Sequence, residues 1–312
     1  MHLLIPFAAP WSQGGVQALS ALELPRLSAL LASAGEPVLD CGDQASLSPP
    51  HERALARALG LAGADGLIPW AAWWAETDGI GVQTPPDLDW GLLTPVHWHV
   101  GTGQVTLMDP DALALDEAGS RALFDTVHEL FASEGFVLVY GAPTRWYLAH
   151  EILAELATAS LDRVIGRNLE PWLPRTHAAR LWRRLQNEAQ MRLYSHSLNA
   201  GREAQGLLPV NSLWLSGCGP QQTATAAADL VVDARLRRPV LAEDWAAWTD
   251  AWCELDAGPI AELSAARREH AATLTLCGER CAASWRLHPR SSWQTLTARW
   301  RRADARRRLE TL

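Results

Sequence analysis

The chain has 312 residues, of which 48% are hydrophobic and 20% charged, and its formal net charge is −8 at pH 7. This length and apolar content allow a sizeable core in one large domain or two ordinary ones. The acidic balance gives no general attraction to nucleic acid or to an anionic membrane. Every basic residue other than histidine is an arginine, which excludes Schiff-base chemistry on a lysine and the lysine of a P-loop.

The start of the chain and its cysteines indicate a cytoplasmic protein. Residues 1–10 lack the basic and long apolar regions of a secretion signal, and no apolar run approaches the roughly 20 residues that cross a bilayer. An odd number of cysteines is typical of a reducing compartment, and the chain has five: Cys41, Cys218, Cys253, Cys277 and Cys281.

We expect no disulfide framework, and we expect Cys277 and Cys281 to be a reduced pair near the end of a buried strand. A zinc site there would need a second close pair of ligands, and none follows in the sequence.

The first sixty residues predict one strand and two helices. The apolar run 2–7 predicts a buried strand. A helix is expected over 24–35, because Pro25 is typical of a helix start and Gly35 of a helix end. A second helix is expected over 51–61.

The next segment predicts a boundary, a hairpin, a helix and a strand. Residues 78–95 are rich in Gly, Pro and Asp, which favours a boundary there. The alternating segment 97–108 predicts a hairpin that turns at its two glycines. An amphipathic helix is expected over 115–135, with Asp116 as its N-cap, and a strand over 136–140.

The second half continues the alternation of helices and strands. A helix is expected over 176–194, with an apolar side marked by Leu181, Leu185 and Met191. The remaining predicted elements are strands at 211–217 and 272–278 and a helix at 242–256. Interleaved helices and short apolar strands favour an α/β fold with at least one mixed sheet.

Polar and conformationally special residues are concentrated between His196 and Gly219. His196, Asn199 and Arg202 are spaced three apart, so one helical turn would place them on one side. The guanidinium of Arg202 suits a carboxylate or a phosphate. Asn211 opens the apolar strand that contains Trp214. Two interpretations stay open: these five side chains bind a small anion, or the Asn and Arg side chains satisfy buried loop backbone.

The motif His196-x-x-Asn199-x-x-Arg202-x-x-x-Gly206-x-x-Pro209-x-Asn211-x-x-Trp214-x-x-Gly217-x-Gly219 closely resembles a segment of the archaeal-type, 2,3-bisphosphoglycerate-independent phosphoglycerate mutases. That family belongs to the alkaline-phosphatase superfamily. The whole chain more specifically resembles proteobacterial proteins described as regulators of pathogenicity factors. The resemblance implies an alkaline-phosphatase-like mixed sheet flanked by helices. It places this core at 1–93 and 212–312, with an α+β segment at 94–211 inserted into it.

The groups that the active mutases use for chemistry do not appear at the matching positions. Those enzymes hold two divalent metals with Asp and His and phosphorylate a Ser nucleophile. Here the first strand carries no acid, and aligning His51 with the family's helix His puts Leu47 at the nucleophile position, with Ser46 and Ser48 out of register. No Asp-x-x-x-His pair follows residue 220.

These departures imply a non-catalytic, mutase-like protein with a regulatory or small-anion-sensing role and no cofactor. Its partners would be a small phosphorylated acid or another protein. One alternative is an active, metal-dependent mutase or phosphohydrolase that uses Mn²⁺ or Mg²⁺. Another is a protein-interaction scaffold, which the 16 tryptophans would suit.

Two further features have weaker functional interpretations. His97 and His99 share one face of a predicted strand, and His51 could approach them as a third metal ligand, although a tryptophan-supported core or site edge is the simpler reading. Nucleic-acid contact or a solvated helix end would each explain the six C-terminal arginines, Arg299, Arg301, Arg302, Arg306, Arg307 and Arg308. We expect the solvated helix end, because no helix-turn-helix pattern accompanies them.

Overall fold

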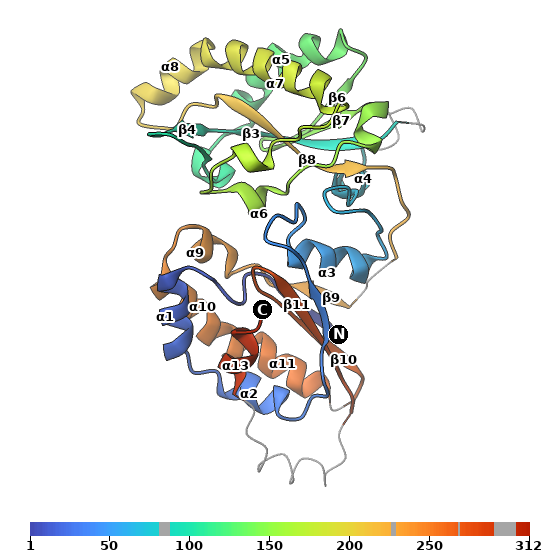
Figure 1. Ribbon diagram of the computed structural model, residues 1–312, viewed down its shortest axis with the longest axis vertical. Coiled ribbons are helices and arrows are strands. Elements are labelled where there is room, and N and C mark those ends of the chain that lie inside the picture. Colours follow the sequence, from blue (N-terminus) through green and yellow to red (C-terminus); the bar gives the residue numbers. More distant parts are fainter. Residues whose placement is uncertain (81–87, 226–228, 268, 290–303) are drawn as a thin grey trace. The chain divides into compact units, whose positions relative to one another are not determined.

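The computed structural model describes residues 1–80, 88–225, 229–267, 269–289 and 304–312. The chain forms two compact units (Figure 1). Unit 1 consists of residues 1–45, 49–59 and 225–312, and unit 2 of residues 46–48 and 60–224. Both ends of the chain therefore belong to one unit, and the middle of the chain forms the other.

Unit 1 is built on a five-stranded mixed sheet. Its strands, in spatial order, are β2 (Val38–Cys41), β11 (Cys281–Leu287), β10 (Ala272–Cys277), β1 (His2–Ile5) and β9 (Leu230–Val232). The strand β1 is parallel to both of its neighbours, while β11 is antiparallel to β10 and to β2. This confirms the predicted α/β fold with a mixed sheet flanked by helices.

Helices cover both faces of this sheet. They are α1 (Gln13–Ala21), α2 (Pro25–Leu31), α3 (Pro50–Leu59), α9 (Arg237–Leu241), α10 (Trp245–Ala257), α11 (Pro259–Ala266) and α13 (Ala305–Leu309). Side chains alternate along a strand, so Leu3 and Ile5 pack on one face with Trp248 and Trp252 of α10. Leu4 packs on the other face with Ala54 of α3.

The expectation of a reduced Cys277–Cys281 pair was wrong for Cys281. Cys281 forms a disulfide with Cys41, and the register of β11 and β2 places these two residues directly opposite each other, with Cα atoms 4.0 Å apart. Cys277 is free and fully buried against Leu4, on the other face of the sheet. A partner 240 residues away is not visible in the local sequence.

Unit 2 is built on a four-stranded antiparallel sheet. Its strands, in spatial order, are β6 (Val137–Ala142), β7 (Arg145–Ala149), β3 (Trp90–Val96) and β8 (Ser212–Gly219). The helices α5 (Glu117–Ala132) and α7 (Ala179–Tyr194) pack with the larger core cluster of this unit, whereas α4 (Trp70–Thr77) belongs to a second cluster with Trp90 and Tyr147. The predicted hairpin is present as β4 (Trp98–Val100) and β5 (Val105–Leu107).

Short elements complete unit 2. They are the helices α6 (Leu161–Val164) and α8 (Ser197–Ala204) and the 3₁₀ helices Pro110–Leu113, Glu151–Ala154 and Glu170–Trp172. Asp116 caps α5 as predicted, because its carboxylate accepts the backbone N–H of Gly119 at 2.8 Å. The apolar side of α7 differs from the prediction: Leu185 is buried, but Met191 is 75% exposed, and Leu193 is buried instead.

The units divide at other positions than the expected 93/94 and 211/212. The strand β3 crosses the first expected boundary, and its Thr94 pairs with Trp214 of β8. Residues 60–93 and 212–224 therefore belong to unit 2 together with the middle of the chain. Long-range pairing of two strands sets this division, and the local composition at 78–95 does not reveal it.

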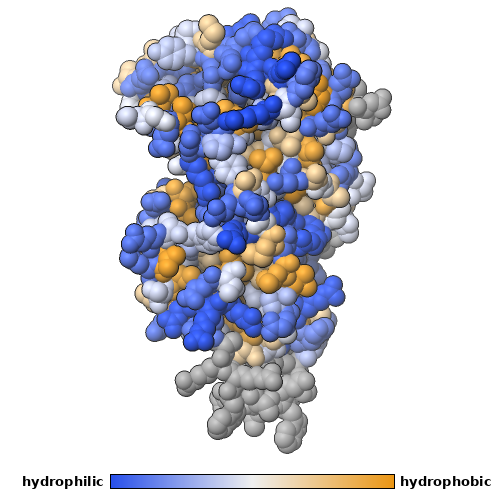
Figure 2. All heavy atoms as spheres, viewed as in Figure 1, coloured by the Kyte–Doolittle hydropathy of each residue, from blue (hydrophilic) through white to orange (hydrophobic). Residues whose placement is uncertain are grey.

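The faces of both units seen in Figure 2 are mostly hydrophilic, with apolar side chains in small groups. Among the helices that the structure describes, none combines the length and the hydropathy that a bilayer crossing requires.

Candidate functional site

Asn199 of the motif is buried and bonded to main chain on two sides. Its side-chain N–H groups donate to the carbonyl oxygens of Leu193, at 2.7 Å, and Val210, at 2.8 Å. Its Oδ1 accepts the N–H of Val210 at 2.9 Å. The amide therefore ties the end of α7 to the segment that leads into β8.

Arg202 of α8 is 7% exposed and also bonds to carbonyl groups. Its Nε donates to Leu208 at 2.9 Å, and a terminal nitrogen donates to Leu113. Burial lowers the pKa of this guanidinium, and the nearby carboxylate of Asp116 opposes that change. An arginine that serves two carbonyls in a buried place is typical of loop support.

Asn211 holds the main chain of Trp98 through both ends of its amide. Its Oδ1 accepts the N–H of Trp98 at 2.7 Å, and its Nδ2 donates to the carbonyl of Trp98 at 2.9 Å. Beside it, Nδ1 of His97 lies 2.8 Å from the carbonyl oxygen of Pro209. The motif thus fixes the start of the β4–β5 hairpin.

The other two candidate residues also bond to nearby main chain. His196 is the N-cap of α8, where its Nδ1 accepts the N–H of Leu198 at 3.1 Å. The indole of Trp214 is 2% exposed and donates to the carbonyl of Ala159 at 2.9 Å. These contacts, with those of Asn199, Arg202 and Asn211, are the ones that loop support requires. Binding of an anion by the five residues stays a prediction.

The weak metal candidates fall in two units. His51 belongs to unit 1, where its ring lies 5.0 Å from the ring of Phe7 between centroids. His97 and His99 belong to unit 2, with ring centroids 6.4 Å apart. Within the part of the chain that the structure describes, no group of three or more His, Cys, Asp or Glu side chains could hold a metal ion.

Leu47, Ser46 and Ser48, the positions that the sequence resemblance aligns with or beside a nucleophile, are bonded to a nearby carboxylate. Asp65 accepts the backbone N–H groups of Leu47 and Ser48 at 2.8 Å each, and it accepts the hydroxyl of Ser46 at 3.2 Å. The hydroxyl of Ser48, a buried residue, accepts the N–H of Gly66 at 2.9 Å.

The carboxyl end of β1 is apolar. In α/β sheets this edge is where ligands usually bind. Here β1 is followed by Pro6, Phe7 and Ala8, and the N–H of Ala8 donates to the carbonyl of Cys277 at 2.8 Å. The carboxylate after the neighbouring β9, Asp233, is paired with Arg235 at 2.9 Å.

Part of the arginine-rich C-terminal segment can be placed. Arg299, Arg301 and Arg302 lie outside the described residues. Arg306 pairs with Asp304 at 3.3 Å, and Arg308 pairs with Glu36 at 3.4 Å. Arg307 is the remaining arginine of α13.

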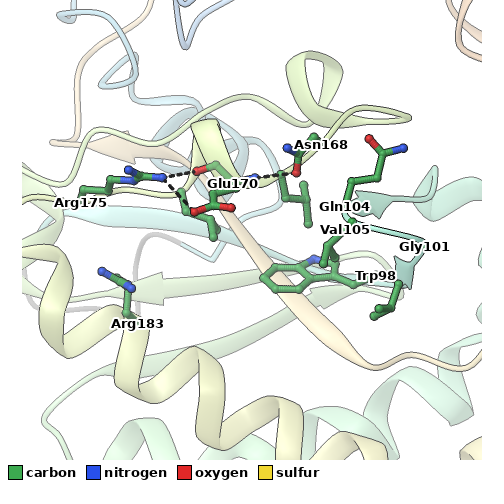
Figure 3. A pocket seen from close by; sticks show the side chains of 12 residues that line it. Trp98, Gly101, Gln104, Val105, Asn168, Glu170, Arg175 and Arg183 are labelled. Carbon is green, nitrogen blue, oxygen red and sulfur yellow. Dashed lines mark hydrogen bonds and ion pairs between the residues drawn. The ribbon is translucent and has the colours of Figure 1, made fainter.

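Unit 2 contains an open pocket of about 650 Å³ beside the β4–β5 hairpin (Figure 3). Its walls come from the hairpin, from residues 168–175 and from one position of α7. Trp98, Val105, Leu169 and Leu173 supply apolar lining, while Arg175 and Arg183 supply positive charge. A pocket of this volume suits a small molecule.

The two arginines of the pocket differ in their partners. Arg175 donates to the carboxylate and to the main-chain oxygen of Glu170, at 3.4 and 3.3 Å. Arg183 extends from α7 toward the side where Arg175 and Glu170 lie (Figure 3), and it has no ion pair or side-chain hydrogen bond with the described residues. One guanidinium at the pocket is therefore available to an anion.

Trp98 has an unused donor as well. Its indole N–H is buried and has no acceptor among the described residues. The sequence analysis mentioned Trp98 only as the residue between His97 and His99, and it did not predict Arg175 or Arg183 as site residues. The glycine turn of the hairpin was the one local indication of this pocket, because the other walls come from distant segments.

No protein-family model and no curated protein sequence matches the chain. Among solved structures, it is similar to a cofactor-independent phosphoglycerate mutase from Thermoplasma acidophilum DSM 1728, with 15% identity and a TM-score of 0.39, over 95% of this chain and 94% of that one. It is also similar to the PH0037 protein from Pyrococcus horikoshii, with 13% identity and a TM-score of 0.40, over 95% of this chain and 92% of the other. At these values, neither likeness assigns an activity, a substrate or a ligand to this chain.

Proposed function

We propose that the protein is a non-catalytic, phosphoglycerate mutase-like member of the alkaline-phosphatase superfamily. In this proposal it binds a small anion in the pocket of unit 2, and it regulates a protein partner according to whether the anion is bound. The motif from His196 to Gly219 and the mixed sheet of unit 1 support the relationship. The departures from the mutase pattern support the loss of catalysis.

The residues at the former catalytic positions support the non-catalytic part of the proposal, because they have other structural tasks. The backbone at Leu47 and both neighbouring serine hydroxyls are bonded to Asp65 or Gly66. The ring of Phe7, just after β1, lies against the ring of His51. A phosphoryl-transfer centre would need charged metal ligands and a freely reacting hydroxyl in such places.

The observation that carries the anion-binding part is Arg183. Its guanidinium lines the pocket without a partner among the described residues, next to Arg175, whose charge is shared with Glu170. A guanidinium recognises carboxylates and phosphates through paired N–H donors. Hydrogen bonds between charged groups contribute about 1.5–3 kcal/mol, and the lower end applies here because Arg183 is exposed.

Titration calorimetry with 3-phosphoglycerate, inorganic phosphate and benzoate tests the binding site. We expect at least one of these anions to bind, and Arg183→Gln to weaken that binding about tenfold. Arg180→Gln is the matched control, because Arg180 is an exposed arginine of the same helix outside the pocket. If none of the three anions binds, or if both variants behave alike, the proposed site is wrong.

A separate assay tests the absence of catalysis. The protein is incubated with 3-phosphoglycerate and Mn²⁺, and both 2-phosphoglycerate and free phosphate are measured. We expect neither product above the rate without protein. Formation of either product that stops when the metal is chelated would establish the enzyme alternative.

A further inference from the structure

We infer that the ligand of the unit 2 pocket is an aromatic monocarboxylate, bound with its ring on Trp98 and its carboxylate at Arg183. This inference rests on the proposed function, since it names the chemical class of the small anion. It differs from the expectation of a phosphorylated acid, because the pocket combines an apolar lining with little net charge.

The apolar part of the pocket suits a flat ring. Trp98 lines the pocket, and its ring makes no ring contact with another aromatic side chain among the described residues. Val105, Leu169 and Leu173 add aliphatic surface around it. Aromatic rings pack on an indole in offset or edge-to-face arrangements, and such a contact adds binding free energy to that gained from burying apolar area. A three-carbon phosphorylated acid has no group that would use this surface.

The main chain of Trp98 is fixed by hydrogen bonds from a side chain of the motif. Asn211 holds its main chain from both sides, at 2.7 and 2.9 Å. Its indole N–H has no acceptor among the described residues, whereas Trp146 and Trp214 donate to Ser120 and Ala159. A main chain fixed by the motif and an indole that lines the pocket suit a platform for a ligand ring.

The charge of the pocket favours a single negative charge. Arg175 and Arg183 contribute two positive charges and Glu170 one negative charge, and the Arg175–Glu170 pair lies at 3.4 Å. One net positive charge remains, at Arg183. A carboxylate carries one negative charge, which matches this net charge. A phosphorylated acid carries more than one negative charge, and the additional charge would be repelled by the nearby carboxylate of Glu170. The side-chain amides of Gln104 and Asn168 line the same pocket and offer neutral donors.

Calorimetry of the full chain with four probes separates the parts of this inference. 2-Naphthoate has the ring and the charge, 2-naphthol has the ring alone, hexanoate has the charge with an aliphatic body, and 3-phosphoglycerate has more charge without a ring. We expect 2-naphthoate to bind at least about tenfold more tightly than each of the other three. Equal binding of hexanoate or tighter binding of 3-phosphoglycerate would overturn the inference and leave the proposed anion site standing. No binding by any probe would overturn both.

Two substitutions of Trp98 test the platform. Trp98→Leu should weaken 2-naphthoate about tenfold and leave hexanoate within about twofold, while Trp98→Phe should retain most of the affinity for 2-naphthoate. Trp11→Leu is the control, since Trp11 is 40% exposed and lies in unit 1. Thermal melting of each variant shows whether it folds. If Trp98→Leu and Trp98→Phe bind 2-naphthoate equally, the ring of Trp98 is not the platform.

Discussion

The side-chain amide of Asn211 is hydrogen-bonded to both main-chain groups of Trp98, as an acceptor at 2.7 Å and as a donor at 2.9 Å. An antiparallel strand neighbour makes the same exchange of bonds. Asn211, the residue just before β8, thus acts as a one-residue partner for β4. This contact connects the motif at 196–219 to the wall of the pocket.

We predict that Asn211→Ala lowers both stability and ligand affinity. The variant leaves the N–H and C=O of Trp98 without these partners, and a part-buried group that loses its hydrogen bond costs about 1–3 kcal/mol. Urea unfolding should show this loss, and calorimetry should show weaker binding of 2-naphthoate. Asn187→Ala is the control, because Asn187 is an exposed residue of α7. Equal unfolding midpoints for the two variants would mean that the hydrogen bonds between Asn211 and Trp98 contribute nothing to stability.

Peptide mapping without reductant should find Cys41 joined to Cys281. These residues face each other in the β2–β11 pairing, with Cα atoms 4.0 Å apart. Disulfides typically contribute about 2–4 kcal/mol, so Cys41→Ser should unfold at a lower urea concentration than the wild type. Cys253→Ser, at an exposed free cysteine, should not. Recovery of five free thiols from freshly isolated protein would contradict the assignment.

The three free cysteines should differ in their reaction with iodoacetamide. Burial raises the pKa of the Cys218 thiol to about 12, and it raises the pKa of the Cys277 thiol further. The reactive thiolate is therefore scarce at both positions near pH 8, whereas Cys253 is exposed. Mass spectrometry should find Cys253 modified within minutes and the other two protected until the protein unfolds. Rapid modification of Cys218 under native conditions would show that its surroundings open.

Local features of this fold could be predicted from the sequence, whereas the pairing of distant segments could not. The cap of α5 at Asp116 and the hairpin at 97–108 follow from neighbouring residues, and both are present. The division between the units was misplaced because it depends on the pairing of β3 with β8. The bond between Cys41 and Cys281 joins residues 240 positions apart.

The candidate site shows the same limit. Trp98, Arg175 and Arg183 come from three segments, and nothing in any one segment marks them as neighbours. The motif itself was conspicuous because polar and conformationally special residues are concentrated between His196 and Gly219, but several of their partners, such as Trp98 and Leu113, lie far away in the sequence. Its spacing alone does not separate loop support from ligand binding, since both require buried Asn and Arg.

Arg202→Ala separates those two interpretations of the motif. The variant removes the donors to the carbonyl oxygens of Leu208 and Leu113, and buried acceptors left without partners cost about 1–3 kcal/mol. We therefore expect its melting temperature to fall by several degrees. Arg180→Ala, at an exposed position of α7, should have the same melting temperature as the wild type. Thermal-shift measurements with 3-phosphoglycerate, 2-phosphoglycerate and phosphate complete the test. If Arg202→Ala melts like the wild type but loses a stabilisation by one of these anions, Arg202 binds the ligand and the loop-support interpretation fails.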